Sequence, residues 1–222
     1  MPVNQQLLAA IQATLGPAIT PSLTQASAGD DLYEAYVLSI VVDAAREEGA
    51  TVTFHNISGA AVGVFTFRTS PGYIHSDTQD YTYARFEFAN APTLEAHVGI
   101  RVSGRSTVLH EADVAVVKQS EAVACRQNEI NPRSHELVVA VECKFYGANI
   151  PLGMARGFLG LVSDFSAKEA YFVTNMAGQN ATRLLAYRAK HWEIGVQPSA
   201  PTTVLRLRNA FQKALRNHID RS

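Results

Sequence analysis

The chemistry-bearing residues of this sequence are two carboxylates and an amine on separate apolar segments. Glu142 and Lys144 lie near the end of the apolar run 136–145, and Asp113 lies within the apolar run 107–117. Residues two apart in a strand share a face, so Glu142 and Lys144 project to the same side if 136–145 is a strand. Charges at the end of an apolar strand cost free energy unless they are paired or bind a ligand. The spacing therefore indicates either a ligand site or an ion-paired strand edge.

Carboxylates, phosphate oxygens and water are the ligands that Mg²⁺ prefers. If Asp113 lies beside Glu142, the two carboxylates can hold one Mg²⁺ ion, for which Mn²⁺ can substitute. Lys144 would then orient or help to deprotonate a water on the ion, and would offset charge that builds on a scissile phosphate. The alternative is an ordinary ion pair between Glu142 and Lys144 on a solvated edge.

This arrangement resembles the PD-(D/E)xK nuclease superfamily, which includes many restriction endonucleases, Holliday-junction resolvases and repair nucleases. The resemblance rests on Asp113, followed about thirty residues later by Glu142-Cys143-Lys144, and it covers roughly residues 30–194. Ala112 stands where the family motif has proline. The segment 170–175, which leads into a predicted helix, is similar to the segment that closes the core of Mrr-like restriction enzymes.

The resemblance implies a restriction-endonuclease-like α/β fold, with a mixed central sheet flanked by helices. It implies that Asp113 and Glu142 bind the metal, that the carbonyl of Cys143 adds a ligand, and that Lys144 serves the water. Glu34, on the helix before the sheet, would complete the acidic cluster. Glu34 has an alternative role as a first-turn acid that stabilises the helix dipole.

The function implied by the resemblance is Mg²⁺-dependent hydrolysis of DNA phosphodiester bonds, in prokaryotic restriction, phage defence or repair. Cutting both strands favours a homo-oligomer, and a dimer in particular. The absence of an ATPase motif suggests a separate nuclease subunit, with a defence-system partner as one option. The alternative is an inactive binding or scaffolding subunit with the same fold, which the near-neutral pI of 6.7 favours because many DNA-binding domains are basic.

The elements that must position these residues follow from hydrophobic periodicity. Helical spacing predicts a short helix over 3–15 and a long helix from Asp30 or Asp31 to Gly49. Runs rich in β-branched and aromatic residues predict strands at 51–55, 62–67, 81–88, 94–102, 107–117 and 136–145. The segments 69–80 and 118–134 are predicted loops. Beyond Gly147 the pattern predicts a helix after Pro151, a strand at 171–174, a helix at 179–191, a strand at 192–196 and a terminal helix.

Composition predicts one soluble domain. The 222 residues are 47% hydrophobic and 18% charged, which excludes a disordered or fibrous chain. We expect a nuclease-like core at 30–196, preceded by a helix and linker at 1–29 and followed by a linker and basic helix at 197–222. The sequence shows neither a secretory signal nor an apolar run of membrane-spanning length, and its two cysteines read as free thiols. A cytoplasmic location without membrane contact is therefore expected.

Charge is distributed unevenly along the chain. Residues 1–100 carry a formal net charge of −7, and residues 101–222 carry +6. A polyanion would therefore contact the second half, although the two halves can also neutralise each other within one fold. Basic residues that can hold phosphates, or can be solvated as in any loop or helix face, are Arg101, Arg105, Arg126, Arg133, Arg206, Arg208, Lys213 and Arg216.

Overall fold

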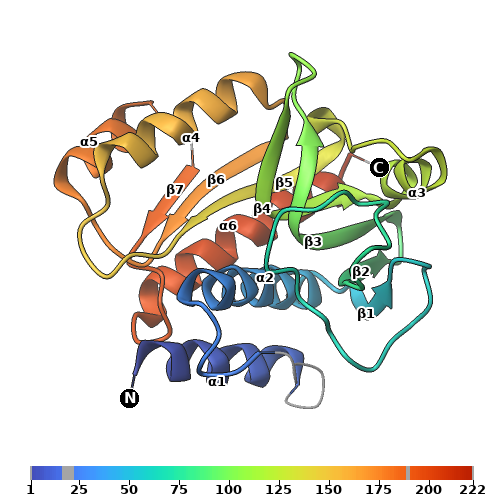
Figure 1. The fold of residues 1–222 in the computed structure, drawn as a ribbon, viewed down its shortest axis with the longest axis horizontal. Helices are drawn as coiled ribbons and strands as arrows, with labels where there is room; N and C mark the ends of the chain where they lie inside the picture. The colour runs from blue at the N-terminus through green and yellow to red at the C-terminus, as the bar shows by residue number, and fades with distance from the viewer. Residues whose placement is uncertain (1, 17–22, 189–190, 222) are drawn as a thin grey trace.

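Seven strands form one mixed sheet in the described part of the chain, which in this computed structural model is residues 2–16, 23–188 and 191–221 (Figure 1). The strands are β1 (Thr51–Asn56), β2 (Thr82–Phe88), β3 (Ala91–Ser103), β4 (Leu109–Lys118), β5 (Leu137–Lys144), β6 (Glu169–Thr174) and β7 (His191–Ile194). They pair in sequence order, antiparallel from β1 to β5 and parallel from β5 to β7. The predicted mixed α/β sheet is thus observed.

Six α-helices within the described residues pack on this sheet. They are α1 (Val3–Leu15), α2 (Gly29–Glu47), α3 (Gln119–Asn128), α4 (Leu152–Asp164), α5 (Gln179–Arg188) and α6 (Pro201–Ile219). In the same part of the chain, no helix combines the length and the apolar character needed to cross a membrane.

The helices α2 and α6 cover one face of the sheet, and α1 packs against α2 (Figure 1). Leu7 of α1, Leu38 of α2 and Phe211 of α6 are fully buried in one apolar core with Val114 and Val141 of the sheet. The first helix, α1, and the last helix, α6, therefore pack in the same hydrophobic core as α2.

The other face of the sheet is covered by α3, α4 and α5. Residue alternation along β6 shows the two faces, because Tyr171 and Val173 join the α2 core whereas Phe172 packs with Phe158 of α4. At the other end of the sheet, Ala122 of α3 packs in a separate cluster with Ala115 of β4. The sheet is thus enclosed on both sides where it carries the candidate site.

Two predictions of secondary structure are wrong. Residues 62–67 do not form a strand; Phe65 and Phe67 are buried there in a loop, and the Phe65 ring makes an edge contact with Phe54 at 5.4 Å. The alternating apolar residues of this segment are therefore buried, although the segment does not pair as a strand. The predicted loop at 118–134 contains α3, which turns Ala122 and Cys125 into the core at helical spacing.

The remaining predicted elements are confirmed apart from shifts at their ends. The helix predicted at 179–191 ends at Arg188 as α5, and His191 already belongs to β7. Residues 17–22 of the predicted N-terminal linker and residues 189–190 lie outside the described residues.

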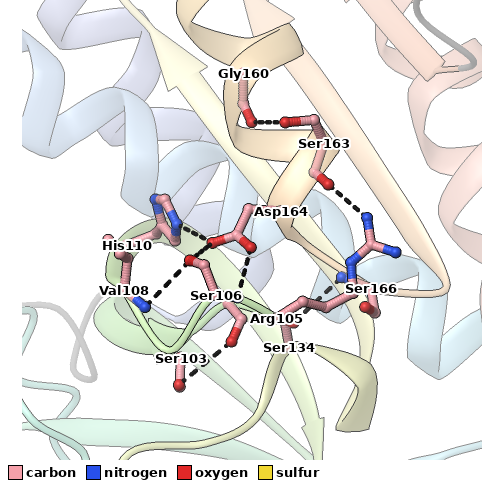
Figure 2. Close-up of polar contacts among 11 residues, drawn as sticks. Ser103, Arg105, Ser106, Val108, His110, Ser134, Gly160, Ser163, Asp164 and Ser166 are labelled. Carbon is pink, nitrogen blue, oxygen red and sulfur yellow. Dashed lines mark hydrogen bonds and ion pairs between the residues drawn. The ribbon is translucent and has the colours of Figure 1, made fainter.

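The turn between β3 and β4 is fastened to the end of α4. Asp164 accepts hydrogen bonds from the Ser106 backbone N–H at 2.8 Å and the Ser106 hydroxyl at 2.6 Å. His110 Nε2 lies 2.8 Å from the same carboxylate, and the Arg105 guanidinium donates to the Ser163 carbonyl (Figure 2). Because β4 carries Asp113 and α4 follows β5, this clamp fixes two elements that flank the candidate site.

The clamp predicts an acid-sensitive contribution to stability. The Ser106 hydroxyl, His110 and the Ser106 amide lower the pKa of Asp164 from 3.8 to about 2. A carboxyl group whose pKa is lower in the folded than in the unfolded protein stabilises the fold at pH values above its ordinary pKa. This stabilisation is lost as the pH falls through the pKa of the folded state. We expect Asp164→Asn to lower the free energy of urea unfolding near neutral pH and to have a smaller effect near pH 2. An equal difference at both pH values would contradict this role.

Candidate active site

Pairing of β4 with β5 brings the predicted chemical residues together. Val114 lies opposite Val141, so Asp113 and Glu142 are the next residues on the two strands. Lys144 Nζ lies 2.8 Å from Glu142 Oε1 and 3.5 Å from Asp113 Oδ2. Two carboxylates and one ammonium group therefore share one location, although they come from separate parts of the chain.

Asp113 is held in place by the backbone of β5. The Cys143 N–H donates a 2.7 Å hydrogen bond to Asp113 Oδ2, and Asp113 is only 4% exposed. On the other side, the register of β3 against β4 places Gly99 opposite Asp113. Gly99 has φ +59°, which favours glycine. A Cβ at Gly99 would contact Ser70 and Arg68, so the glycine sits where this segment approaches β3, and Gly99 and Ser70 both line the same cavity as Asp113.

These residues line a cavity of about 330 Å³ between α2, the sheet and the loop at 69–71. Glu34 lines it from α2, together with Lys144 and the buried Cys143 of β5. Glu142 does not line this cavity. It lies in a separate small space beside Phe158, and its contact with a cavity residue is the ion pair with Lys144. The complete set of lining residues is Asp30, Asp31, Glu34, Thr69, Ser70, Pro71, Gly99, Glu111, Asp113, Cys143, Lys144, Phe145 and Tyr146.

Glu111 and Asp31 are cavity residues that the sequence analysis did not assign to the site. Glu111 borders the cavity two residues before Asp113. Its position on the same predicted face as Asp113 was the signal for this role. Asp31 gave no such signal, because its place in the cavity depends on how α2 packs on the sheet.

The cavity contains more negative than positive charge. Burial, then Asp113 and Glu111, raise the pKa of Glu34 from 4.5 to about 9. Burial, then Glu142, raise the pKa of Asp113 from 3.8 to about 7, against the opposing effect of Lys144. Burial alone would lower the pKa of Lys144, but Asp113 and Glu142 raise it above its ordinary value, so Lys144 is charged.

The donor set fits a hard divalent cation. Among the described residues, Glu34 has no hydrogen-bond or ion-pair partner, and no group of three or more His, Cys, Asp or Glu side chains is already gathered around one point. Mg²⁺ needs only one or two protein carboxylates, because water and phosphate oxygens complete its octahedron. Burial raises the pKa of the Cys143 thiol well above its ordinary value, so only the carbonyl of Cys143 suits such an ion.

Glu34→Gln is expected to stabilise the metal-free protein. Since the folded-state pKa of Glu34 is raised, its contribution to stability is best at acid pH and declines as the pH rises from about 4.5 to about 9. The variant removes this like-charge repulsion, and we expect its melting temperature in EDTA to exceed that of the wild type by at least about 2 °C at alkaline pH. Asp77→Asn, in an exposed loop, is the control. An unchanged melting temperature at every pH would contradict the electrostatic argument.

The arginines proposed as phosphate contacts near the site are mostly engaged within the fold. Arg133 pairs with Glu121 at 2.6 Å, and Arg105 donates to the Ser163 carbonyl at the end of α4. Arg101 lies opposite Glu111, with its guanidinium 5.3 Å from the centre of the Tyr73 ring. Of this group, Arg101 is therefore the best placed to reach a phosphate at the cavity.

Three arginines of α6 pair with acidic residues of neighbouring elements. Arg208 Nη1 lies 3.0 Å from Glu47 Oε1, and Arg216 Nε lies 3.2 Å from Glu48 Oε2. Arg206 forms an ion pair with Glu193 of β7. These contacts favour mutual neutralisation of the two halves of the chain over a phosphate-binding role for α6.

Arg126 belongs to a buried polar network on β3. Its guanidinium donates to both oxygens of Glu95, at 2.8 Å and 2.7 Å, and Glu95 is fully buried. His97 Nε2 lies 3.2 Å from Glu95 Oε2. Burial would raise the pKa of Glu95, but the hydrogen bonds from His97 and Arg126 outweigh it and lower the pKa. The network joins α3 to the sheet.

Comparison of the chain with protein-family models, with curated proteins and with solved structures finds no match. The functional argument therefore rests on the residues of the cavity and their chemistry. A buried aspartate and a charged lysine in a carboxylate-rich cavity, with Glu142 paired to that lysine from outside the cavity, define the chemistry available.

Proposed function

We propose that this chain is a metal-dependent nuclease that hydrolyses DNA phosphodiester bonds with Mg²⁺ or Mn²⁺. The observation that carries the proposal is the position of Lys144 between Glu142 and the buried Asp113, at the wall of a cavity with excess negative charge. The PD-(D/E)xK resemblance supports it. An antiparallel β4–β5 pair, followed by α4 and the parallel strand β6, is compatible with the proposed restriction-endonuclease-like fold.

In this proposal the side chains have separate roles. Asp113 and Glu142 would hold the ion together with the Cys143 carbonyl, and Glu34 would complete the acidic cluster from α2. When bound, the ion supplies a water of lowered pKa and polarises the phosphate. Lys144 is a poor proton acceptor because its pKa is raised, so its role is to orient the water and to offset negative charge on the phosphate.

The biological setting is proposed on the resemblance alone. Cleavage of both DNA strands in one encounter requires two sites, so we propose a homodimer that acts in prokaryotic restriction, phage defence or repair, with a defence-system subunit as a further partner. Light scattering at working concentration tests the dimer, and a monomer would argue against it.

An inactive binding or scaffolding subunit is the second candidate. It is favoured by the engagement of Arg105, Arg126 and Arg133 in internal contacts, which removes three of the arginines predicted to contact phosphates.

Calorimetric titration with Mn²⁺ separates the two candidates. We expect the wild type to bind Mn²⁺ and Asp113→Asn to lose this binding, while Asp77→Asn, in an exposed loop, retains it. Plasmid cleavage by the wild type should require Mg²⁺ or Mn²⁺ and stop with EDTA. Mn²⁺ binding that is absent, or is unchanged by Asp113→Asn, would favour the scaffold.

A further inference from the structure

A second cavity, of about 500 Å³, adjoins the acidic one, and Phe145 and Tyr146 line both. It lies at the carboxyl ends of the parallel strands. Residues 145–147 follow β5, Asn175 and Met176 follow β6, and Gln197 follows β7. Residues 2–5 at the start of α1, together with Gln25, complete its walls. The carboxyl ends of parallel strands are where open α/β sheets bind ligands.

The chemistry of this second cavity differs from that of the first. Among the described residues, no acidic or basic side chain lines it. A metal ion would need carboxylates and a phosphate would need cations, so neither is its natural occupant. Five of the lining residues carry carboxamides, namely Asn4, Gln5, Gln25, Asn175 and Gln197. The others are mainly apolar or aromatic: Pro2, Val3, Phe145, Tyr146, Gly147 and Met176.

The carboxamides divide into a fixed frame and a free set. Asn175 Oδ1 accepts from the Tyr146 N–H at 2.8 Å, and Asn175 Nδ2 donates to the Tyr146 carbonyl at 2.9 Å, so the wall after β5 is held in place. Asn4 also belongs to the fixed frame, because its Nδ2 donates to the Gln25 and Ser27 carbonyls, each at 3.3 Å. Within the described part of the chain, the side-chain amides of Gln5, Gln25 and Gln197 have no hydrogen-bond partner. They can pair with a ligand that offers both donors and acceptors.

We propose that this second cavity, the amide cavity, binds an unpaired nucleobase. Carboxamides form paired hydrogen bonds with base edges, and apolar or aromatic side chains contact base faces. A base within a duplex is stacked and paired and must leave the stack to enter such a pocket. Resting on the proposed nuclease function, the inference assigns DNA with unpaired nucleotides next to the cleaved phosphate as the substrate class.

Binding of the four 2′-deoxynucleosides, followed by NMR titration of the full chain in EDTA, tests the amide cavity without metal or catalysis. A Cβ added at Gly147 meets no atom within 4 Å, so Gly147→Leu can extend into the cavity. Gly153→Leu, at an equally open glycine of α4 outside the cavity, is the matched control. We expect at least one nucleoside to bind, and its affinity to fall at least about tenfold in Gly147→Leu but not in Gly153→Leu.

A second variant guards against a folding defect in Gly147→Leu. Gln197→Ala removes one free carboxamide, and we expect it to weaken nucleoside binding, whereas Gln127→Ala, an exposed amide on α3, leaves it unchanged. Deoxyribose, which lacks a base, should not bind. Absence of nucleoside binding, or equal affinity in all four variants and the wild type, would overturn the inference.

Cleavage assays distinguish this inference from the proposed function. With Mn²⁺, we expect the wild type to cut a duplex with an unpaired bubble faster than the same bubble with abasic sites, and Gly147→Leu to remove that preference. If nucleosides bind the wild type and not Gly147→Leu, but no DNA is cut, base binding is supported and the nuclease proposal fails. If paired and unpaired DNA are cut alike without nucleoside binding, the nuclease proposal stands and the inference fails.

Discussion

Lys144→Ala is expected to lower the rate of Mg²⁺-dependent DNA cleavage by about 10²- to 10³-fold. Its ammonium group lies within ion-pairing distance of Asp113 and Glu142, and it is the cation nearest to the place where phosphate charge would develop. Asp113→Asn is expected to cost at least as much, since it removes a buried ligand charge. Its side-chain oxygen can still accept the Cys143 N–H, so the fold around it should persist.

Plasmid nicking at saturating Mg²⁺ measures this loss. Lys168→Ala, an exposed lysine outside the cavity, should cut at the wild-type rate. Mn²⁺ calorimetry then separates the two roles, because Asp113→Asn should lose the metal and Lys144→Ala should keep it. Cleavage that continues undiminished in either variant would remove the basis for the nuclease assignment.

Arg126→Met is expected to lower the free energy of unfolding by about 3–5 kcal/mol, because it leaves the fully buried Glu95 carboxylate without its guanidinium partner. The methionine conserves much of the volume, so the lost charge pairing dominates. Arg85→Met, which breaks the half-buried pair with Glu87 at the surface of the sheet, should cost less than the loss of the fully buried pair.

Urea unfolding measures both losses, and the double variant Arg126→Met with Glu95→Gln identifies their cause. The neutral carboxamide removes the unpaired charge and keeps a hydrogen-bond partner for His97, so the double variant should recover part of the stability that the single variant loses. No recovery in the double variant would assign the loss to packing of α3 and not to an unpaired charge.

The sequence predicted the strands of the candidate site because their pattern is local. The run 107–117 and the run 136–145 are apolar with charges at defined offsets, and antiparallel neighbours in sequence commonly pair in the sheet. A strand was wrongly predicted at residues 62–67, because buried Phe65 and Phe67 alternate there without strand pairing. The helix α3 was missed because its buried residues are small, with Ala122 and Cys125 in place of a bulky apolar stripe.

The amide cavity had no signature in the sequence. Its walls come from the start of α1 and from residues after β5, β6 and β7. Gln5 and Gln197 are separated by most of the chain, and only tertiary packing makes them neighbours. The place of Glu111 in the acidic cavity was missed for a related reason, because strand alternation places it on the same face as Asp113 but does not show the depth of the cavity beside it.

The ion pairs between α6 and α2 bear on how such a protein meets a polyanion. Arg208 and Arg216 are already matched by Glu47 and Glu48, so the positive half of the chain does not present a free basic surface there. DNA that contacts this part of α6 would therefore release few condensed counterions there. In the proposed function, recognition would depend less on α6 than on short-range contacts at the divalent ion and at the base, which makes local distortion of the nucleic acid important for binding.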